Sequence, residues 1–126
     1  MGTPADAKNE VVPQPGESVV PKRTNSAFIG TDLERSLRGA GIDTLVITGV
    51  ITGVSTNNCV EATVRIAGNL GFQTYLVADA CFTFARPDFQ GRMRGADEVH
   101  SMSLANLDGE YCKVINTSDA LAGQYA

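Results

Sequence analysis

A run of β-branched residues and glycines that leads through a polar turn into a helical pattern constrains the fold of this chain most. Residues 45–54 are almost entirely β-branched or glycine, as in a strand covered on both faces of a sheet. Residues 60–70 then repeat apolar side chains at helical spacing. The turn between them places Cys59 where the predicted helix begins, and the unpaired N–H groups and positive dipole there favour a thiolate. Cys59 is therefore a candidate nucleophile, and the alternative is a small buried core residue.

The segment Gly-Val-Ser-Thr-Asn-Asn-Cys-Val at residues 53–60, followed by Glu-Ala-Thr-Val-Arg, resembles the nucleophile segment of the isochorismatase-like cysteine hydrolases. That family includes isochorismatases, nicotinamidases, N-carbamoylsarcosine amidases and ureidoacrylate hydrolases. The resemblance extends from about Glu17 to about Leu121. It implies a three-layer α/β/α, Rossmann-like fold with a mostly parallel sheet and a catalytic triad of Asp, Lys and Cys.

The resemblance also implies roles for residues near Cys59. Lys22 matches the catalytic lysine of the family, which would stabilise the thiolate; taken alone, Lys22 beside Arg23 reads as a solvated surface pair. The oxyanion hole would be formed by the backbone N–H groups of Ser55 and Cys59. A cis peptide between Val54 and Ser55 would turn one of these groups into the site, at a cost of about 3 kcal/mol.

The third member of the triad has no match in the sequence. The family's Asp follows the first strand of the sheet, whereas the acids upstream of Lys22 are Asp6, Glu10 and Glu17, and none follows such a strand. The chain thus resembles the C-terminal two-thirds of the family, as a natural short form, a gene fragment or a degenerate copy. The early Asp and His cluster of metal-binding members is also missing, and the single histidine, His100, leaves no metal-ligand spacing. We expect no metal and no cofactor.

The chain divides into a lead-in over residues 1–16, disordered or extended, and a partial α/β domain over residues 17–126. Residues 17–22 are expected to form a short edge strand. Thr31 and Glu34 have the spacing of a capping box that begins a helix ending near Gly41. A central strand is then predicted from Ile42 to Val54.

This central strand contains a tandem repeat. Ile-Thr-Gly-Val occurs at residues 47–50 and again at residues 51–54, although the family needs one copy. The β-branched run over residues 45–54, ten residues at about 3.3 Å each, already exceeds the usual strand length, so either a protruding strand or a bulge near Gly49 is expected.

The remaining elements alternate between helix and strand. The pattern predicts a helix over 58–69, a strand over 73–80, a loop with a possible helical turn over 82–95, a helix over 96–107, a strand over 111–116 and a terminal turn over 119–121. Such alternation is typical of a parallel sheet with right-handed crossovers.

Several other residues invite functional interpretations. A structural role is favoured for His100, because it lies inside a helix, and for Asp79, whose counterpart in the family braces loops by accepting backbone N–H bonds. Cys81 is expected to be partly exposed and Cys112 to lie in the core. A cluster after the strand end either walls a pocket or packs against another subunit: Phe82, Phe84, Arg86 and Phe89.

Composition excludes several classes of protein. The 126 residues suit one domain, and a net charge of −4 with scattered Lys and Arg residues argues against a nucleic-acid surface. No apolar run reaches the length of a membrane span, and no signal peptide is evident. Three cysteines without a secretory signal indicate a reducing, cytoplasmic compartment. We therefore expect a small-molecule substrate, a homo-oligomer, and neither nucleic acid nor membrane as partner.

The sequence predicts a cysteine hydrolase that cleaves a C–N bond of a small amide or carbamoyl compound through a thioester on Cys59. The alternative is a catalytically silent fragment or pseudoenzyme that acts as an oligomer partner. A third possibility is a redox-sensing thiol at Cys59.

Overall fold

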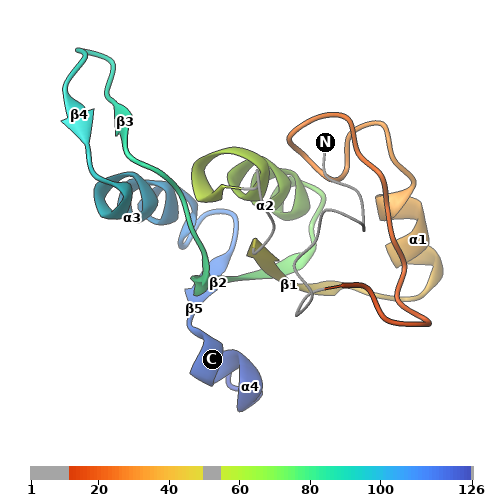
Figure 1. The fold of residues 1–126 in the computed structure, drawn as a ribbon. Helices are drawn as coiled ribbons and strands as arrows, with labels where there is room; N and C mark the ends of the chain where they lie inside the picture. The colour runs from red at the N-terminus through yellow and green to blue at the C-terminus, as the bar shows by residue number, and fades with distance from the viewer. Residues whose placement is uncertain (1–11, 50–54, 126) are drawn as a thin grey trace.

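A parallel sheet of three strands forms the centre of the protein in the computed structural model, which describes residues 12–49 and 55–125. The strands are β1 (Thr44–Gly49), β2 (Gln73–Cys81) and β5 (Lys113–Ile115). Their order is β1-β2-β5, and both pairings are parallel. The long β2 therefore lies between the two others (Figure 1).

Helices connect and cover these strands, and a small hairpin projects from one end (Figure 1). The helices are α1 (Leu33–Gly39), α2 (Glu61–Asn69), α3 (Ala96–Leu107) and α4 (Thr117–Leu121), and a π-helical turn, η3 (Thr56–Val60), leads directly into α2. The hairpin consists of β3 (Arg86–Pro87) and β4 (Met93–Arg94), which pair antiparallel.

The side chains of β2 alternate between two hydrophobic clusters. Leu76 is fully buried against Val64 of α2 and Leu107 of α3. On the other face, Tyr75 and Val77 pack with Ile115, and the segment from α4 to Tyr125 covers them. Helical layers therefore lie on both faces of the sheet, which confirms the predicted three-layer α/β/α class.

Three elements of the central and C-terminal parts agree with the sequence prediction. Helix α3 has the predicted bounds, because Gly95 precedes it and the Gly95 N–H donates to Glu98 Oε2 at 2.8 Å. Strand β2 extends one residue beyond the predicted 73–80. The predicted helix over 58–69 is also present, but its first turn is π-helical.

Two predictions for the N-terminal part were wrong. Residues 17–22 form no strand in the structure. The capping box is also absent, because the Thr31 hydroxyl donates to the Ala27 carbonyl at 2.6 Å instead of accepting from Glu34. Asp32 takes the N-cap position without a side-chain hydrogen bond. The Thr31 hydroxyl also accepts the Leu33 N–H at 3.4 Å, so it links the turn before α1 to the first residue of the helix.

The predicted loop over residues 82–95 forms a hairpin, not a helical turn. Asp88 organises it: its backbone N–H donates to the Arg92 carbonyl at 2.7 Å, and its carboxylate accepts the N–H groups of Gln90 and Arg92 at 3.0 and 2.9 Å. Gly91 closes the tight turn with a φ of +86° and donates to the Asp88 carbonyl. The turn residues therefore determine this structure more strongly than the flanking sequence.

The predicted central strand is described only in part. Strand β1 ends at Gly49, and residues 50–54, which include the second Ile-Thr-Gly-Val copy, lie outside the described residues. The register with β2 is irregular at this point, since Ile47 lies opposite Leu76 but Gly49 lies opposite Cys81. An irregularity therefore lies near Gly49, where a bulge was one of the two expectations. The division at residue 16 stays a prediction, and residues 1–11 lie outside the described residues.

Candidate active site

Cys59 lies on the π-helical turn between the end of β1 and helix α2. The turn is wide because the Val60 N–H donates to the Ser55 carbonyl five residues earlier, at 3.3 Å. The Asn58 amide also donates to the Ser55 hydroxyl at 3.0 Å. Cys59 is buried, with 9% of its surface exposed. A helix entry that is widened in this way is common at functional sites.

Lys22 reaches Cys59 from 37 residues earlier in the chain. Its Nζ lies 3.4 Å from Cys59 Sγ, 2.9 Å from the Thr24 carbonyl oxygen and 3.2 Å from the Asn25 carbonyl oxygen. An ammonium group has three N–H donors, so the two carbonyls and the sulfur together match its capacity. The arrangement therefore suits a charged lysine beside a thiolate, the pairing that activates cysteine nucleophiles.

The Asn25 side chain is the third group at the sulfur. Its Oδ1 lies 3.6 Å from Cys59 Sγ, as the acceptor of a thiol S–H bond. If the thiol loses its proton, a half-turn of the amide would present Nδ2–H donors to the sulfur instead. Asn25 can thus accompany both protonation states of Cys59.

The segment that carries Lys22 has turns and bends but no helix or strand, so side chains fix it to α2. The Ala27 N–H donates to Thr63 Oγ1 at 3.0 Å. The Phe28 ring stacks on Phe72, with 5.8 Å between the ring centroids. These contacts determine where the Lys22 ammonium lies relative to Cys59.

Thr56, at the start of the π-helical turn, is a fully buried polar residue that the sequence interpretation missed. Its hydroxyl lies 3.0 Å from the Phe82 carbonyl oxygen and 2.8 Å from His100 Nδ1, and its backbone N–H also donates to Phe82. The hydroxyl has one proton. When that proton goes to the Phe82 carbonyl, His100 Nδ1 must carry the hydrogen of the other bond. His100 thus holds the turn in place, in agreement with the structural role favoured above.

A buried serine of α3 strengthens the same connection. The Ser103 hydroxyl lies 3.3 Å from the Thr56 carbonyl oxygen and 3.1 Å from Glu61 Oε1. The start of the nucleophile helix is therefore tied to α3 through two side chains, His100 and Ser103. No single-sequence signal identifies this link, because Thr and Ser are common and the partners are more than 40 residues apart.

Asp79 is also structural. Its Oδ1 accepts the backbone N–H of Thr117 at 2.7 Å and the Thr117 hydroxyl at 2.8 Å. The hydrogen bond from the hydroxyl is the main reason why the pKa of Asp79 is below its usual value. The residue thus joins the end of β2 to the start of α4, in agreement with the bracing role predicted for it.

The other two cysteines differ from Cys59 in their surroundings. Burial raises the pKa of the Cys81 thiol to about 11 and that of the Cys112 thiol to about 11. Both are partly buried, so Cys112 is less enclosed than predicted, and all three cysteines are free thiols. At neutral pH, Cys81 and Cys112 are protonated and poor nucleophiles.

The predicted oxyanion hole lies only partly within the described residues. Ser55 and Cys59 lie at the two sides of the turn, four residues apart, and both are buried. Val54 lies outside the described residues, so the predicted cis peptide before Ser55 does too. The assignment of these N–H groups to an oxyanion stays a prediction.

A surface groove of about 1090 Å³ lies on the other side of the nucleophile turn. The hairpin, α3 and the turn line it, through residues that include Asn57, Glu61, Arg86 and Phe89. Cys59 and Lys22 do not contribute to it. Asn57 lies two positions before Cys59 and Glu61 two positions after it, so both side chains are on the opposite face of the helix entry. The groove that they line therefore does not lead to the Cys59 sulfur.

Residues 12–49 and 55–125 contain neither a metal-binding cluster nor a membrane-spanning helix. There, no three His, Cys, Asp or Glu side chains gather in a way that could hold a metal ion. In the same ranges, no helix combines the length and the apolar character that crossing a membrane requires.

The chain is similar to known proteins over most of its length. The family model described as the Isochorismatase domain matches residues 2–119. An isochorismatase-family crystal structure from Chromobacterium violaceum ATCC 12472 is 61% identical, with a TM-score of 0.87, over 93% of this chain and 58% of that one. The uncharacterized isochorismatase family protein YrdC of Bacillus subtilis (strain 168) is 40% identical over 90% of this chain and 59% of its own length.

A relative with a named activity covers a smaller part. The ureidoacrylate amidohydrolase RutB of Stutzerimonas stutzeri (strain A1501) is 41% identical over 64% of this chain and 31% of its own length. The chain thus spans less than two-thirds of each of these three relatives. By the match of the family model over residues 2–119 and by these similarities, the chain belongs to the isochorismatase family.

Proposed function

We propose that this protein is a cysteine hydrolase that cleaves the C–N bond of a small amide or carbamoyl compound through a thioester on Cys59. The observation that carries the proposal is the 3.4 Å contact between Lys22 Nζ and Cys59 Sγ. The amidohydrolase activity in the name of RutB supports the substrate class.

The proposed reaction has two stages. The Cys59 thiolate attacks the carbonyl carbon, and the carbonyl electron pair moves onto oxygen, which the N–H groups of Ser55 and Cys59 would stabilise. The C–N bond then breaks, and the nitrogen leaves with a proton. In the second stage, water attacks the thioester and gives a proton to the Lys22 amine, the C–S bond breaks, and the carboxylate product leaves with the Cys59 thiolate and the Lys22 ammonium restored.

Lys22 has two tasks in this scheme. Its positive charge stabilises the thiolate and the negative charge that develops nearby, and its N–H is the nearest donor for protonating the leaving nitrogen. Among the described residues, no carboxylate is hydrogen-bonded to Lys22 or Cys59. General acid and base assistance contributes about 10²- to 10⁴-fold in rate; if the chain lacks a counterpart of the family's Asp, as its sequence predicts, turnover should be slower by a factor in that range.

The test is to trap the thioester. The purified chain is mixed with a panel of small primary amides and carbamoyl compounds, quenched in acid and analysed by intact-protein and peptide mass spectrometry. We expect the mass of the acyl group on the peptide that contains Cys59, together with release of ammonia or amine. Cys59→Ser should abolish turnover and Lys22→Met should lower it at least 100-fold.

Cys81→Ala is the matched control, because it removes a thiol that is largely protonated at neutral pH and should retain turnover. The same turnover by Cys59→Ser as by the unaltered chain would show that the hydrolysis belongs to a contaminant or to another residue. An adduct on Cys81 or Cys112 but not on Cys59 would also contradict the proposal.

A second candidate is a catalytically silent partner that assembles with itself or with a longer relative. Apolar side chains exposed at Val46 on β1 and at Phe89 on the hairpin favour it, since such groups on a monomer are often interaction sites. A stable oligomer in which Cys59 reacts with iodoacetamide no faster than Cys81, and in which no amide is cleaved, would favour this function over the first.

A further inference from the structure

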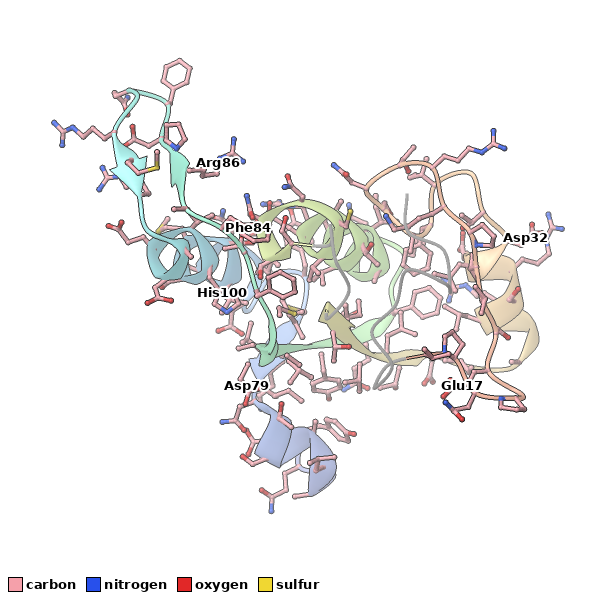
Figure 2. All side chains as sticks on the ribbon, in the orientation of Figure 1. Glu17, Asp32, Asp79, Phe84, Arg86 and His100 are labelled. Carbon is pink, nitrogen blue, oxygen red and sulfur yellow. The ribbon has the colours of Figure 1, made fainter. Side chains whose placement is uncertain are left out.

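Asn25 contacts the nucleophilic sulfur, and the two stages of the proposed reaction give it no task. Its Oδ1 lies 3.6 Å from Cys59 Sγ. The residue belongs to the irregular segment between Glu17 and Asp32, which are labelled in Figure 2, and it is exposed, whereas Cys59 is nearly buried. A molecule that approaches the sulfur from solvent therefore comes close to the Asn25 amide.

The backbone of Asn25 is held in place on both sides of the residue. Lys22 Nζ donates to the carbonyl oxygens of Thr24 and Asn25, at 2.9 and 3.2 Å. Two residues further on, the Ala27 N–H donates to Thr63 Oγ1 at 3.0 Å. These bonds fix where the Asn25 side chain begins relative to Cys59. The terminal amide can still rotate, so the residue combines a set position with a choice of hydrogen-bonding group.

The Asn25 amide has two arms with opposite roles, an oxygen that accepts hydrogen bonds and an NH₂ group that donates them. In the structure the oxygen accepts the Cys59 S–H. A thiolate has no proton to donate, so the half-turn described above brings Nδ2 to the sulfur and moves Oδ1 to one side of it. A carbon that the thiolate attacks approaches it to about 3–3.5 Å. The nitrogen bonded to that carbon therefore comes within reach of Oδ1.

We propose that Asn25 is a specificity-determining residue of the candidate active site: Nδ2 donates to the Cys59 thiolate while Oδ1 accepts the N–H of the scissile nitrogen. Primary and secondary amides and carbamoyl compounds have this N–H, whereas esters and tertiary amides do not. The bond to Oδ1 also leaves the nitrogen lone pair free to take a proton from Lys22. The inference rests on the proposed hydrolase function, and it narrows the substrate class to compounds with an N–H at the bond that breaks.

A matched pair of substrates tests this role. The N-methylamide and the methyl ester of the same acid differ only in N–H against O, and kcat/KM is measured for both with the unaltered chain and with Asn25→Leu. Leu has a similar size and no polar group. We expect the amide-to-ester ratio of kcat/KM to fall about 3- to 10-fold in Asn25→Leu, the range for one neutral hydrogen bond. The intrinsic reactivity of the ester cancels, because the same pair is compared in both proteins.

A second pair of reagents gives a readout that needs no hydrolysis. N-methyl iodoacetamide and methyl iodoacetate alkylate Cys59 and carry the same contrast of N–H against O. Peptide mass spectrometry measures the two rates at Cys59 and, as an internal reference, at Cys81. The amide-to-ester rate ratio at Cys59 should fall about 3- to 10-fold in Asn25→Leu. The ratio at Cys81 should stay unchanged.

Asn25→Asp separates the two arms of the amide. A carboxylate keeps an acceptor for the substrate N–H but places a negative charge beside the thiolate, which disfavours that form. It should keep the amide-to-ester ratio of the alkylation rates and lower both rates about tenfold. A merely structural role would not produce this division between ratio and rate.

Asn106→Leu is the matched control, because it makes the same substitution at an exposed position of α3. It should change neither the ratios nor the rates. Far-UV circular dichroism verifies that all three variants are folded.

The outcomes separate this inference from the proposed function. If no amide is hydrolysed but the alkylation ratio at Cys59 falls in Asn25→Leu, the hydrolase proposal fails and the role of Asn25 stands. If amides are hydrolysed and the hydrolytic ratio is the same in Asn25→Leu, the role of Asn25 is overturned and the hydrolase stands. Equal losses for amide and ester in Asn25→Leu, or an equal change of ratio in Asn106→Leu, would also overturn it. Where turnover is measurable, the hydrolytic ratio decides; otherwise the alkylation ratio does.

Discussion

Replacing Gly68 by Ala sets helix propensity against packing at one position of α2. An added Cβ would lie 2.6 Å from the Tyr111 carbonyl oxygen and 2.9 Å from the Tyr111 Cα. Ala gains about 1 kcal/mol over Gly inside a helix. Contacts this short with backbone atoms force α2 and the Tyr111 turn apart, and overpacking costs about 1–3 kcal/mol or more. We therefore expect Gly68→Ala to lower the free energy of unfolding by up to about 2 kcal/mol.

Urea denaturation followed by circular dichroism measures this effect, and Gly39→Ala is its matched control. Gly39 ends α1, its φ is not in the left-handed region, and a Cβ there would meet nothing within 4 Å. That change should be neutral or raise the free energy of unfolding by up to about 1 kcal/mol. If Gly68→Ala is as stable as Gly39→Ala, the close approach of α2 to Tyr111 is wrong.

Three further predictions concern other contacts. Thr56→Val removes the hydroxyl that holds the nucleophile turn and should cost about 1–3 kcal/mol, measured by urea denaturation; an unchanged midpoint would refute the link. Labelling of Cys81 and Cys112 by iodoacetamide should rise about tenfold per pH unit from pH 8 to 10; a plateau below pH 9 would contradict their raised pKa. Because the folded chain keeps those thiol protons up to about pH 11 whereas the unfolded chain releases them near pH 9, stability should fall across that interval. Because the pKa of Asp79 is lowered in the folded chain, its carboxylate stabilises the fold above the unfolded-state pKa, and this stabilisation is lost as pH falls through the folded-state pKa. The loss of stability in acid should therefore be smaller in Asp79→Asn than in the unaltered chain. Equal losses of stability in acid would argue against the bond to Thr117.

The sequence predicted elements whose signal is local. Helix α3 begins after Gly95 with acids in its first turn, and its bounds agree with the structure. The strand β2 contains an apolar run over residues 75–78 and was also found. In both cases short-range propensity and long-range burial favour the same conformation, which is when sequence interpretation succeeds.

The hairpin was missed although a local signal was present. Asp88 and Gly91 stand at the first and fourth positions of a turn, a pattern typical of β-turns. The flanking strands have only two residues each, too short for any alternation to be detected. The failed capping box at Thr31 shows the opposite error, since the hydroxyl had a competing acceptor in Ala27 that no spacing rule anticipates.

The candidate site required a different kind of information. Cys59 could be identified from its position at a helix entry, but its contact with Lys22 joins residues separated by 37 positions and was expected only from family resemblance. The link through Thr56, His100 and Ser103 was not predicted at all. Such contacts depend on how α2 and α3 pack, which propensities do not specify.

The irregular segment that carries Lys22 can move away from Cys59 in an equilibrium separate from global unfolding. Residues 12–32 lack the ladder hydrogen bonds that protect the sheet, and they are fastened to α2 through Ala27 and Phe28. This segment can therefore detach while the core stays folded, with a free energy below that of global unfolding. Amide hydrogen exchange in residues 17–30 should accordingly be faster than in β2, and heating should change the reactivity of Cys59, but not that of Cys81 or Cys112, before the circular dichroism changes. A ligand that contacts both Lys22 and Cys59 would slow exchange in this segment first, by the factor 1 + [L]/Kd that linkage prescribes.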